Sequence, residues 1–382
     1  MKILIITENV GGTAPGRVFE RIIQGLSSKH EIDVLTSNQI TSIDLKNLNN
    51  FYHIKKIKLH PYIYKPLIAI IGINPFDVFY SHKCIKYLEA RKNSNYNIII
   101  SFFSNHHYTS IITGYKYSKL INCKYAAYSV DAVPAPGWPE NKAYYKSVKK
   151  LVMKYLSSVD IFFSSNNQML KYQLSTFTNK NNLITDVIYN PNIGSIKNFP
   201  KTDFSAYNFV YTGKLYGVRN AKYILDAFEN LLLKYPNSKL IFVEAEISKS
   251  LLDFLRNETL NKIEFHPHTD NLDYFYSKAT ALIDIDADIE NDVFLSSKMT
   301  NYILVNRIII SETGKNSPSR RLFKGIDSII QCDHDSEQLL FAMEKSILMN
   351  YNMKFHDREA ILRLFSLEAV IDKINESLRK IL

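Results

Sequence analysis

The chain has 382 residues, of which 46% are hydrophobic and 22% are charged, so it is long enough to bury two hydrophobic cores. No run of about eighteen apolar residues occurs, which argues against a membrane-spanning helix. The three cysteines, Cys84, Cys123 and Cys332, are far apart and odd in number, which excludes a disulfide framework or a clustered metal site and is consistent with the cytoplasm.

Charge is distributed unevenly along the chain. Residues 1–200 carry 24 Lys and Arg against 11 Asp and Glu, whereas residues 201–382 carry 23 against 26. The basic half is expected to meet an anionic membrane surface, unless it reflects only background residue usage. Nucleic acid is not an expected partner, because no recognisable nucleic-acid-binding module accompanies the charge.

The first forty residues predict a strand over residues 1–6, a glycine-bearing loop, an amphipathic helix and a second strand. Gly11 and Gly12 precede the helix, and Arg17 lies in its first turn. The glycines do not form a G-x-G-x-x-G pattern, so a dinucleotide fingerprint is absent. The loop remains a candidate contact for donor or acceptor, with a plain tight turn as the alternative.

The stretch over residues 51–79 mixes lysines with aromatic and aliphatic residues. Lysines beside exposed apolar side chains are typical of proteins that touch a membrane interface. The alternative is an irregular connection packed on its own domain.

Two apolar strands are predicted over residues 97–103 and 125–130, and polar residues follow each of them. Ligands of open α/β sheets bind at the carboxyl ends of parallel strands. Asp131 is therefore a candidate to orient a substrate hydroxyl or accept its proton, or else it is a strand-end cap. His106 and His107 are weaker candidates, because adjacent residues at a strand end point in opposite directions.

A second α/β alternation follows a linker over residues 188–200. A strand over 208–211 leads into a loop with Gly213, Lys214 and Arg219 and then into a helix, an arrangement that suits a phosphate group. His268, in the loop after a later strand over 262–265, is a further candidate contact for donor or acceptor, as is Gly213.

The stretch over residues 281–310 predicts a strand, a loop, a helix over 298–305 and another strand. Ser296 and Ser297 are expected to cap the helix. Lys298 in the first turn opposes the helix dipole, so an anionic ligand would explain it. The alternative is a solvated lysine on an ordinary crossover.

The order of these elements resembles the GT-B glycosyltransferases, in particular the family 4 type that uses nucleotide sugars to build cell-surface polysaccharide. The resemblance covers nearly the whole chain, with sharp motif agreement at residues 211–220 and 281–313. It implies an α/β fold of two Rossmann-like parallel-sheet domains facing a cleft. The first domain, 1–195, would bind the acceptor and the second, 196–360, the donor, with a C-terminal helix over 361–382 crossing back to the first.

The family's motifs map onto this chain with substitutions. Its Gly-Arg…Lys pair is similar to Gly213, Lys214 and Arg219, with the two cations exchanged. Glu290 matches the first acid of its Glu-x7-Glu motif, which is associated with the transferred sugar, but Lys298 replaces the second. The segment 296–302 is similar to a Ser-x-Lys version found in polysaccharide-assembly relatives. The glycine-rich turn after the second strand of the donor domain is replaced by residues 244–246.

The resemblance therefore implies a glycosyltransferase that moves a sugar to a glycan or lipid-linked acceptor in capsule, O-antigen or exopolysaccharide biosynthesis, with retained anomeric configuration. The donor diphosphate would be held by Lys214, Arg219, Ser296, Ser297 and Lys298. Glu290 would contact the transferred sugar, and Asp131 would position the acceptor or act as base. The alternatives are a non-catalytic GT-B partner that binds sugar nucleotide or glycan, and a sugar-nucleotide epimerase of the same fold.

Acidic residues at alternate positions, Asp284, Asp286, Asp288, Glu290 and Asp292, raise the possibility of a metal site. The resemblance implies instead that cations hold the diphosphate, so no metal and no cofactor beyond the donor are expected. The expected location is the cytoplasm, including the inner face of the plasma membrane.

Overall fold

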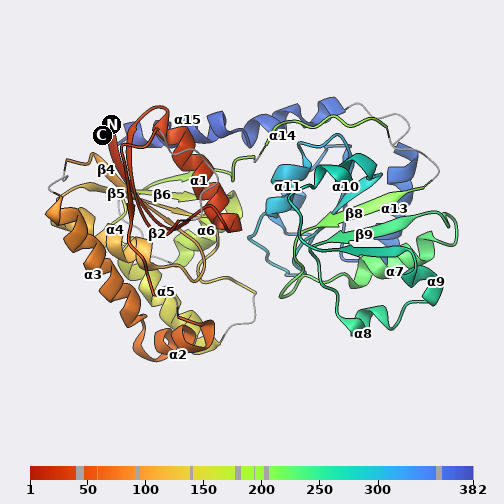
Figure 1. Ribbon diagram of the computed structural model, residues 1–382, viewed down its shortest axis with the longest axis horizontal. Helices are drawn as coiled ribbons and strands as arrows, with labels where there is room; N and C mark the ends of the chain where they lie inside the picture. Colours follow the sequence, from red (N-terminus) through yellow and green to blue (C-terminus); the bar gives the residue numbers. More distant parts are fainter. Residues whose placement is uncertain are drawn as a thin grey trace. The chain divides into compact units, whose positions relative to one another are not determined.

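The computed structural model describes residues 1–39, 47–57, 59–91, 95–137, 141–176, 182–192, 194–201, 206–349 and 355–381. These residues form two compact units. The first unit consists of Met1–Pro191 and Phe365–Leu382, and the second of Asn192–Leu364. Each unit is built on its own parallel β-sheet with packed helices (Figure 1).

The first unit contains a seven-stranded parallel sheet in the order β3-β2-β1-β4-β5-β6-β7. Its strands are β1 (Lys2–Val10), β2 (Glu31–Gln39), β3 (Asn50–His53), β4 (Ile98–Phe103), β5 (Lys124–Ser129), β6 (Ile161–Ser164) and β7 (Ile184–Val187). Every residue of β4 is buried, as expected for a parallel strand covered on both faces. Strand β1 continues past the predicted end at residue 6 and takes Glu8 into the sheet.

Successive side chains of β1 point to opposite faces, and each face has its own core. Leu4 and Ile6 join one apolar cluster, and Ile3 and Ile5 join the other. The first cluster is covered by α3 (Pro75–Ala90), α4 (Thr109–Leu120) and α5 (Lys142–Leu156), and the second by α1 (Ala14–Ser27) and α15 (Leu367–Arg379). The remaining helices of this unit are α2 (Pro61–Ile71) and α6 (Asn167–Thr176).

The predicted return of the C-terminal helix to the first unit is confirmed. Helix α15 buries Val370, Ile371, Ile374 and Leu378, which recur at helical spacing along one side. This side packs on α1 and also contacts β7.

The second unit contains a six-stranded parallel sheet in the order β10-β9-β8-β11-β12-β13. Its strands are β8 (Asn208–Thr212), β9 (Lys239–Val243), β10 (Ile263–His266), β11 (Ala281–Ile285), β12 (Ile308–Glu312) and β13 (Ile329–Cys332). Its helices are α7 (Lys222–Leu231), α8 (Lys249–Leu252), α9 (Asn257–Leu260), α10 (Asp273–Lys278), α11 (Ser297–Tyr302), α12 (Pro318–Leu322), α13 (Ser336–Met349), η1 (Phe355–Arg358) and α14 (Glu359–Leu364).

Strand order reverses once in each sheet, between β1 and β4 in the first unit and between β8 and β11 in the second. Loops on the two sides of such a point leave in opposite directions, so the carboxyl ends of these strands border a crevice. The fold therefore selects the residues after β1 and β4, and those after β8 and β11, as the places to look for a site.

The predicted unit over residues 281–310 is present, with a shorter helix than the sequence indicated. Helix α11 ends at Tyr302 rather than residue 305, because the N–H groups of Leu304 and Val305 donate to the carbonyls of Asn301 and Tyr302. Bonds of this shorter spacing tighten a helix end.

The stretch over residues 51–79 is not an irregular connection: in its described part it contributes β3, α2 and the start of α3. Among the described residues, no helix is both long enough and apolar enough to cross a bilayer. Cys84, Cys123 and Cys332 are free thiols.

Candidate functional site

The loop after β8 carries the predicted Gly213, and its conformation explains the glycine. Gly213 has a φ of +98°, which L side chains rarely adopt, and an added Cβ would lie 3.2 Å from Lys298 Cε. The absence of a side chain thus lets Lys298 lie across this loop. Lys298 Nζ also stands 5.0 Å from the centre of the Tyr211 ring, a cation–π distance.

Lys298 lies in the first turn of α11, near the buried carboxylate of Asp284. The preceding Ser296 does not cap the helix with its side chain; its hydroxyl donates instead to Asp284 Oδ1 at 2.6 Å. Burial, together with the charge of Arg219, lowers the pKa of Lys298 to about 8, although the charges of Asp284 and Asp286 oppose the shift. An ammonium with so low a pKa gains from an added anion.

Arg219 is held against the same acidic cluster. Its Nη2 lies 3.4 Å from Asp286 Oδ1, and only 11% of the Arg219 side chain is exposed. Asp286 is fully buried and also accepts hydrogen bonds from Ser317 and Ser319. Arg219 and Lys298 therefore interact electrostatically with the same two buried carboxylates, Asp284 and Asp286.

Lys214 and His268 both contact Glu244, which stands where the family has a glycine-rich turn. Glu244 Oε1 lies 3.8 Å from Lys214 Nζ, and Glu244 Oε2 lies 3.1 Å from His268 Nδ1. Glu244 has a φ of +66°, a conformation that glycine adopts more readily. The backbone thus keeps the turn typical of glycine, while a carboxylate takes the space beside Lys214.

The five acidic residues at alternate positions between 284 and 292 separate into buried and exposed members. Asp284, Asp286 and Asp292 are buried, whereas Asp288 and Glu290 are exposed. Burial and the charge of Asp286 raise the pKa of Asp292 to about 8. Across the described ranges, no group of three or more His, Cys, Asp or Glu side chains is placed to hold a metal ion. Ser297 is exposed, as is Glu290, on the segment leading into α11.

In the first unit, the Gly11 and Gly12 loop is a compact turn. Gly11 N–H donates to Gly16 O at 3.0 Å, and Thr13 Oγ1 accepts from Gly16 N–H to cap α1. Arg17 is exposed on the first turn of α1. Asp131 is partly exposed and accepts the Asn105 N–H at 3.1 Å, which ties the loop after β5 to the loop after β4.

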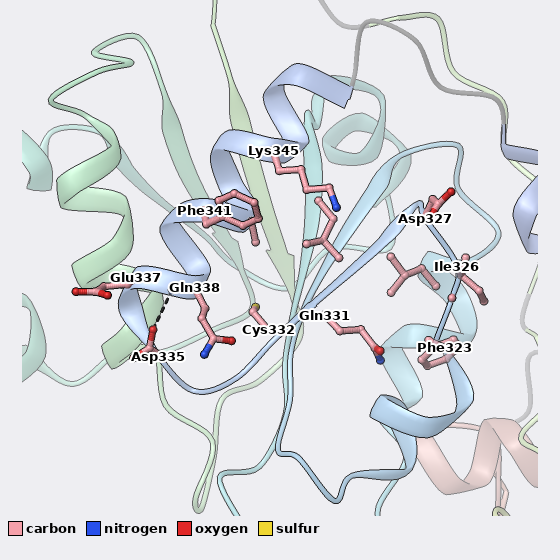
Figure 2. A pocket seen from close by; sticks show the side chains of 14 residues that line it. Phe323, Ile326, Asp327, Gln331, Cys332, Asp335, Glu337, Gln338, Phe341 and Lys345 are labelled. Atoms are coloured by element: carbon pink, nitrogen blue, oxygen red, sulfur yellow. Dashed lines mark hydrogen bonds between the residues drawn. The ribbon is translucent and has the colours of Figure 1, made fainter.

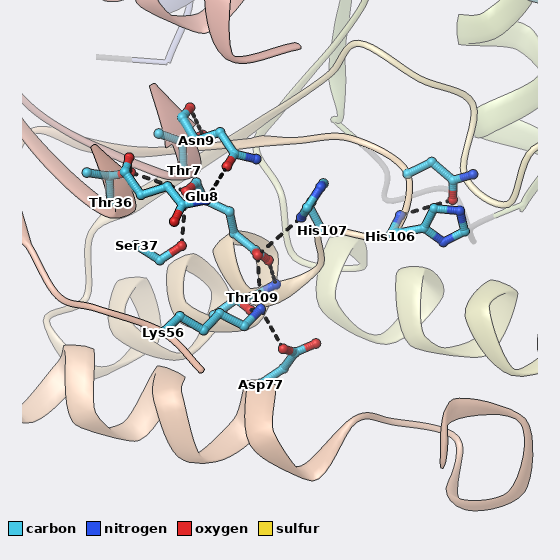
Figure 3. Close-up of polar contacts among 12 residues, drawn as sticks. Thr7, Glu8, Asn9, Thr36, Ser37, Lys56, Asp77, His106, His107 and Thr109 are labelled. Carbon is cyan, nitrogen blue, oxygen red and sulfur yellow. Dashed lines mark hydrogen bonds and ion pairs between the residues drawn. The ribbon is translucent and has the colours of Figure 1, made fainter. Parts of the chain in front are cut away.

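Sequence reasoning missed a buried polar cluster at the carboxyl ends of β1 and β4 (Figure 3). Glu8 accepts from Lys56 Nζ at 2.9 Å, from the Thr109 N–H at 2.9 Å, and lies 3.3 Å from His107 Nδ1. Lys56 also contacts Asp77 at 2.6 Å. The one local signal was Glu8 itself, because an acid inside an apolar strand requires partners.

A further pocket of about 700 Å³ lies in the second unit between β13 and α13 (Figure 2). Its lining includes Gln331, Cys332, Phe341 and Lys345. None of the residues predicted to bind a donor lines it, so it is separate from the candidate site.

No family model matches the chain, and no curated protein matches its sequence. Solved structures match it over their full length. The Anabaena protein HepE in complex with UDP and glucose has a TM-score of 0.70 at 11% identity, with 99% of each chain covered. Sucrose-phosphate synthase from Thermosynechococcus elongatus scores 0.69 at 11% identity, covering 100% of this chain and 99% of its own. The lipopolysaccharide outer core galactosyltransferase WaaB scores 0.67 at 14% identity, with 100% of each chain covered.

These similarities confirm the predicted fold. The chain is an α/β protein with two Rossmann-like parallel-sheet domains of the GT-B type.

Proposed function

We propose that this GT-B chain is a glycosyltransferase that moves a sugar from a nucleoside diphosphate sugar to a glycan or lipid-linked acceptor. The observation that carries the proposal is the set of cations after β8 and β11 in the second unit. Arg219 and Lys298 share one acidic cluster, and Lys214 lies next to Gly213, over which Lys298 passes. Such cations stabilise the charge that grows on a departing diphosphate.

The identities of the matched structures support the same proposal. One is a complex with UDP and glucose, and another is a galactosyltransferase of lipopolysaccharide. We extend the proposal to the synthesis of a cell-surface polysaccharide such as capsule, O-antigen or exopolysaccharide. In this scheme Glu290 contacts the transferred sugar, and the anomeric configuration is retained, as the family resemblance implies.

Donor turnover without an added acceptor separates the proposal from its alternatives. A transferase slowly releases nucleoside diphosphate and free sugar when water replaces the acceptor. An epimerase instead returns an isomerised sugar nucleotide, and a non-catalytic partner binds the donor without releasing product. The products are identified by NMR spectroscopy of each UDP-sugar after incubation. Isomerised donor, or binding with no release, would overturn the transferase assignment.

The reaction is proposed to require no metal, because fixed cations take the place of one at the diphosphate. Donor turnover in excess EDTA tests this directly. We expect an unchanged rate, and a loss of activity that Mg²⁺ or Mn²⁺ restores would contradict the proposal.

Donor binding should take up a proton near pH 8. Lys298 is partly neutral at that pH, and a bound diphosphate favours its charged form, so UDP affinity should fall by about tenfold as pH rises from about 7 to 9. Asp292 becomes negatively charged over the same pH range, and this charge also lowers the affinity for the anionic nucleotide as pH rises. Calorimetry in buffers of different ionisation enthalpy measures the uptake. Lys298→Met should remove more of it than Asp292→Asn; equal uptake in wild type and Lys298→Met would remove Lys298 from the donor site.

We also propose that the first unit touches anionic membrane through α2 and α3. Large apolar side chains are exposed on these helices: Tyr62, Ile63, Ile70, Ile71, Phe76 and Phe79. Tyr62 is 85% exposed and Ile70 is 84% exposed, which favours a partner surface. Sedimentation with phosphatidylglycerol vesicles should carry down the wild type and less of a Tyr62→Ser/Ile70→Ser variant. Absence of binding to anionic vesicles would contradict the contact.

A further inference from the structure

Strand β13 forms one edge of the sheet in the second unit. The strand order of that sheet ends at β13, which pairs with β12 alone among the described strands. Proteins commonly protect such an edge with a charged side chain or a proline, because unpaired backbone groups recruit another strand. At the opposite edge, β10 carries Glu264, which forms ion pairs with Lys239 and His266. β13 has the sequence Ile-Ile-Gln-Cys and carries neither a charge nor a proline.

The hydrogen bonds between β13 and β12 show which backbone groups of β13 face outward. Ser328 O accepts from the Ile309 N–H at 3.0 Å, just before β13 begins. At the end of β13, Cys332 O accepts from the Thr313 N–H at 3.0 Å. Alternate residues of a strand bond to the same neighbour, so positions 328, 330 and 332 face β12. Gln331 therefore turns its backbone N–H and C=O away from the sheet.

Gln331 is also the point at which this edge is open. On the same outward side, the Ile329 N–H is taken by a turn before the strand, and the Asp333 N–H donates to Gln338 Oε1 at 3.0 Å. Within the described ranges, the backbone N–H and C=O of Gln331 have no partner, while its side-chain amide donates to a carbonyl of α12 at 2.8 Å. A free donor and a free acceptor on one residue form a complete pair with the same residue of a second, antiparallel strand.

Helix α13 borders the same opening with an exposed side. Glu337, Phe341 and Lys345 are exposed on it at intervals of four residues, and all three line the pocket of about 700 Å³ to which Gln331 also contributes (Figure 2). Phe341 is 64% exposed, which leaves a large aromatic surface in water. An aromatic centre with polar residues around it is the usual composition of a protein–protein interface.

The charges on this side of α13 are complementary to a second copy of the helix. Glu337 lies four residues before Phe341, and Lys345 lies four residues after it. If two copies of α13 pack antiparallel about a two-fold axis at Phe341, Glu337 of each copy meets Lys345 of the other. Within one helix these two charges are about 12 Å apart along the axis and cannot pair. In the part of the chain that the structure describes, neither forms an ion pair.

We propose that the chain forms a two-fold symmetric dimer through this surface. β13 pairs antiparallel with β13 of the second copy at Gln331, and the two α13 helices pack antiparallel at Phe341. The two six-stranded sheets then join into one continuous sheet. A second copy fits better than a uniformly acidic or basic partner, because such a partner would meet only one of the two charges. None of the residues proposed to hold the donor lines the pocket, so each copy keeps its own donor site.

Reversing the charges one at a time tests the proposed symmetry. Sedimentation velocity of the full chain follows association up to about 100 μM, a range that includes weak interfaces. The wild type should form a dimer as its concentration rises. Glu337→Lys and Lys345→Glu each place like charges opposite one another at two symmetric positions, so each should weaken the dimer by about tenfold or more. An equimolar mixture of the two variants should associate again, because every charge then meets its opposite.

Two further variants separate the interface from general effects of charge and folding. Glu258→Lys makes the same change in net charge at an exposed position of α9 and should dimerise like the wild type. Phe341→Ser should weaken the dimer by about tenfold and leave the circular dichroism spectrum unchanged, because the side chain is exposed. A wild type that stays monomeric over this range overturns the proposal. So does a dimer that none of the substitutions weakens, or a mixture that associates no better than its separate components.

Discussion

Replacing Arg219 with Ala is expected to destabilise the second unit by about 3–5 kcal/mol, the usual cost of removing one partner of a buried ion pair. Arg219 is 11% exposed and faces Asp286, which is fully buried. The variant leaves that carboxylate near two other buried acids, Asp284 and Asp292, without a neighbouring guanidinium. The midpoint of thermal unfolding should fall by about 6–20 °C for a unit of this size.

Two further variants separate this effect on folding from an effect on the donor. Arg219→Ala/Asp286→Asn removes the unpaired charge and should recover much of the lost stability. Lys214→Ala is the matched control, because the Lys214 side chain is 71% exposed and its loss should change stability by no more than about 0.5 kcal/mol. UDP affinity should fall in both. If UDP affinity stays at the wild-type value in Lys214→Ala and in the double variant, Lys214 and Arg219 do not hold the donor diphosphate.

Replacing Lys56 with Met should destabilise the first unit by a similar amount, about 3–5 kcal/mol. Lys56 is 13% exposed and contacts two carboxylates, Glu8 and Asp77, which are 7% and 5% exposed. Without the ammonium, two buried negative charges face each other. Denaturant unfolding of Lys56→Met measures the loss, and the adjacent Lys55→Met is the control, because Lys55 is exposed.

The loss in Lys56→Met should depend on pH in a defined direction. In the wild type, the pKa of Glu8 is held low, so its contribution to stability is present above its usual value of 4.5 and disappears as pH falls through the lowered pKa. In the variant, burial raises the pKa of the orphaned carboxylates, and acidification neutralises them. The difference between variant and wild type should therefore shrink below about pH 5. A difference that stays constant from about pH 4 to 8 would show that packing, not charge, is lost.

Much of the fold was predictable because its signals are local. The apolar run that forms β4 and the strand and loop over residues 281–296 have the composition of buried parallel strands and their loops. Gly213 also marked its loop correctly, since its positive φ and its closeness to Lys298 both require a glycine. The end of α11 was missed because a tightened last turn has no clear sequence signal.

The polar cluster around Glu8 was not predictable in the same way. Glu8 and His107 are separated by 99 residues, and Glu8 and Lys56 by 48. Glu8 and His107 meet because β4 pairs with β1 although β2 and β3 intervene in the chain, and Lys56 comes from the segment after β3. Strand order is a property of the whole sheet, so no local pattern placed these residues together. The divergence of His106, whose Nδ1 contacts the Tyr144 hydroxyl at 2.8 Å, and His107 was foreseen, but which of them would meet a carboxylate was not.

The most direct test of the central claim is a thermal-shift screen of the purified protein against UDP, GDP, CMP and ADP. A nucleotide that binds only the folded chain stabilises it by mass action, which raises the unfolding midpoint. At a hundredfold excess over the dissociation constant, the free energy of unfolding increases by about 2.7 kcal/mol. We expect one nucleotide to raise the midpoint of the wild type, and the shift to disappear in Lys214→Ala, whose midpoint without ligand is unchanged. If no nucleotide raises the midpoint of the wild type, the chain does not bind a sugar-nucleotide donor and the account is wrong.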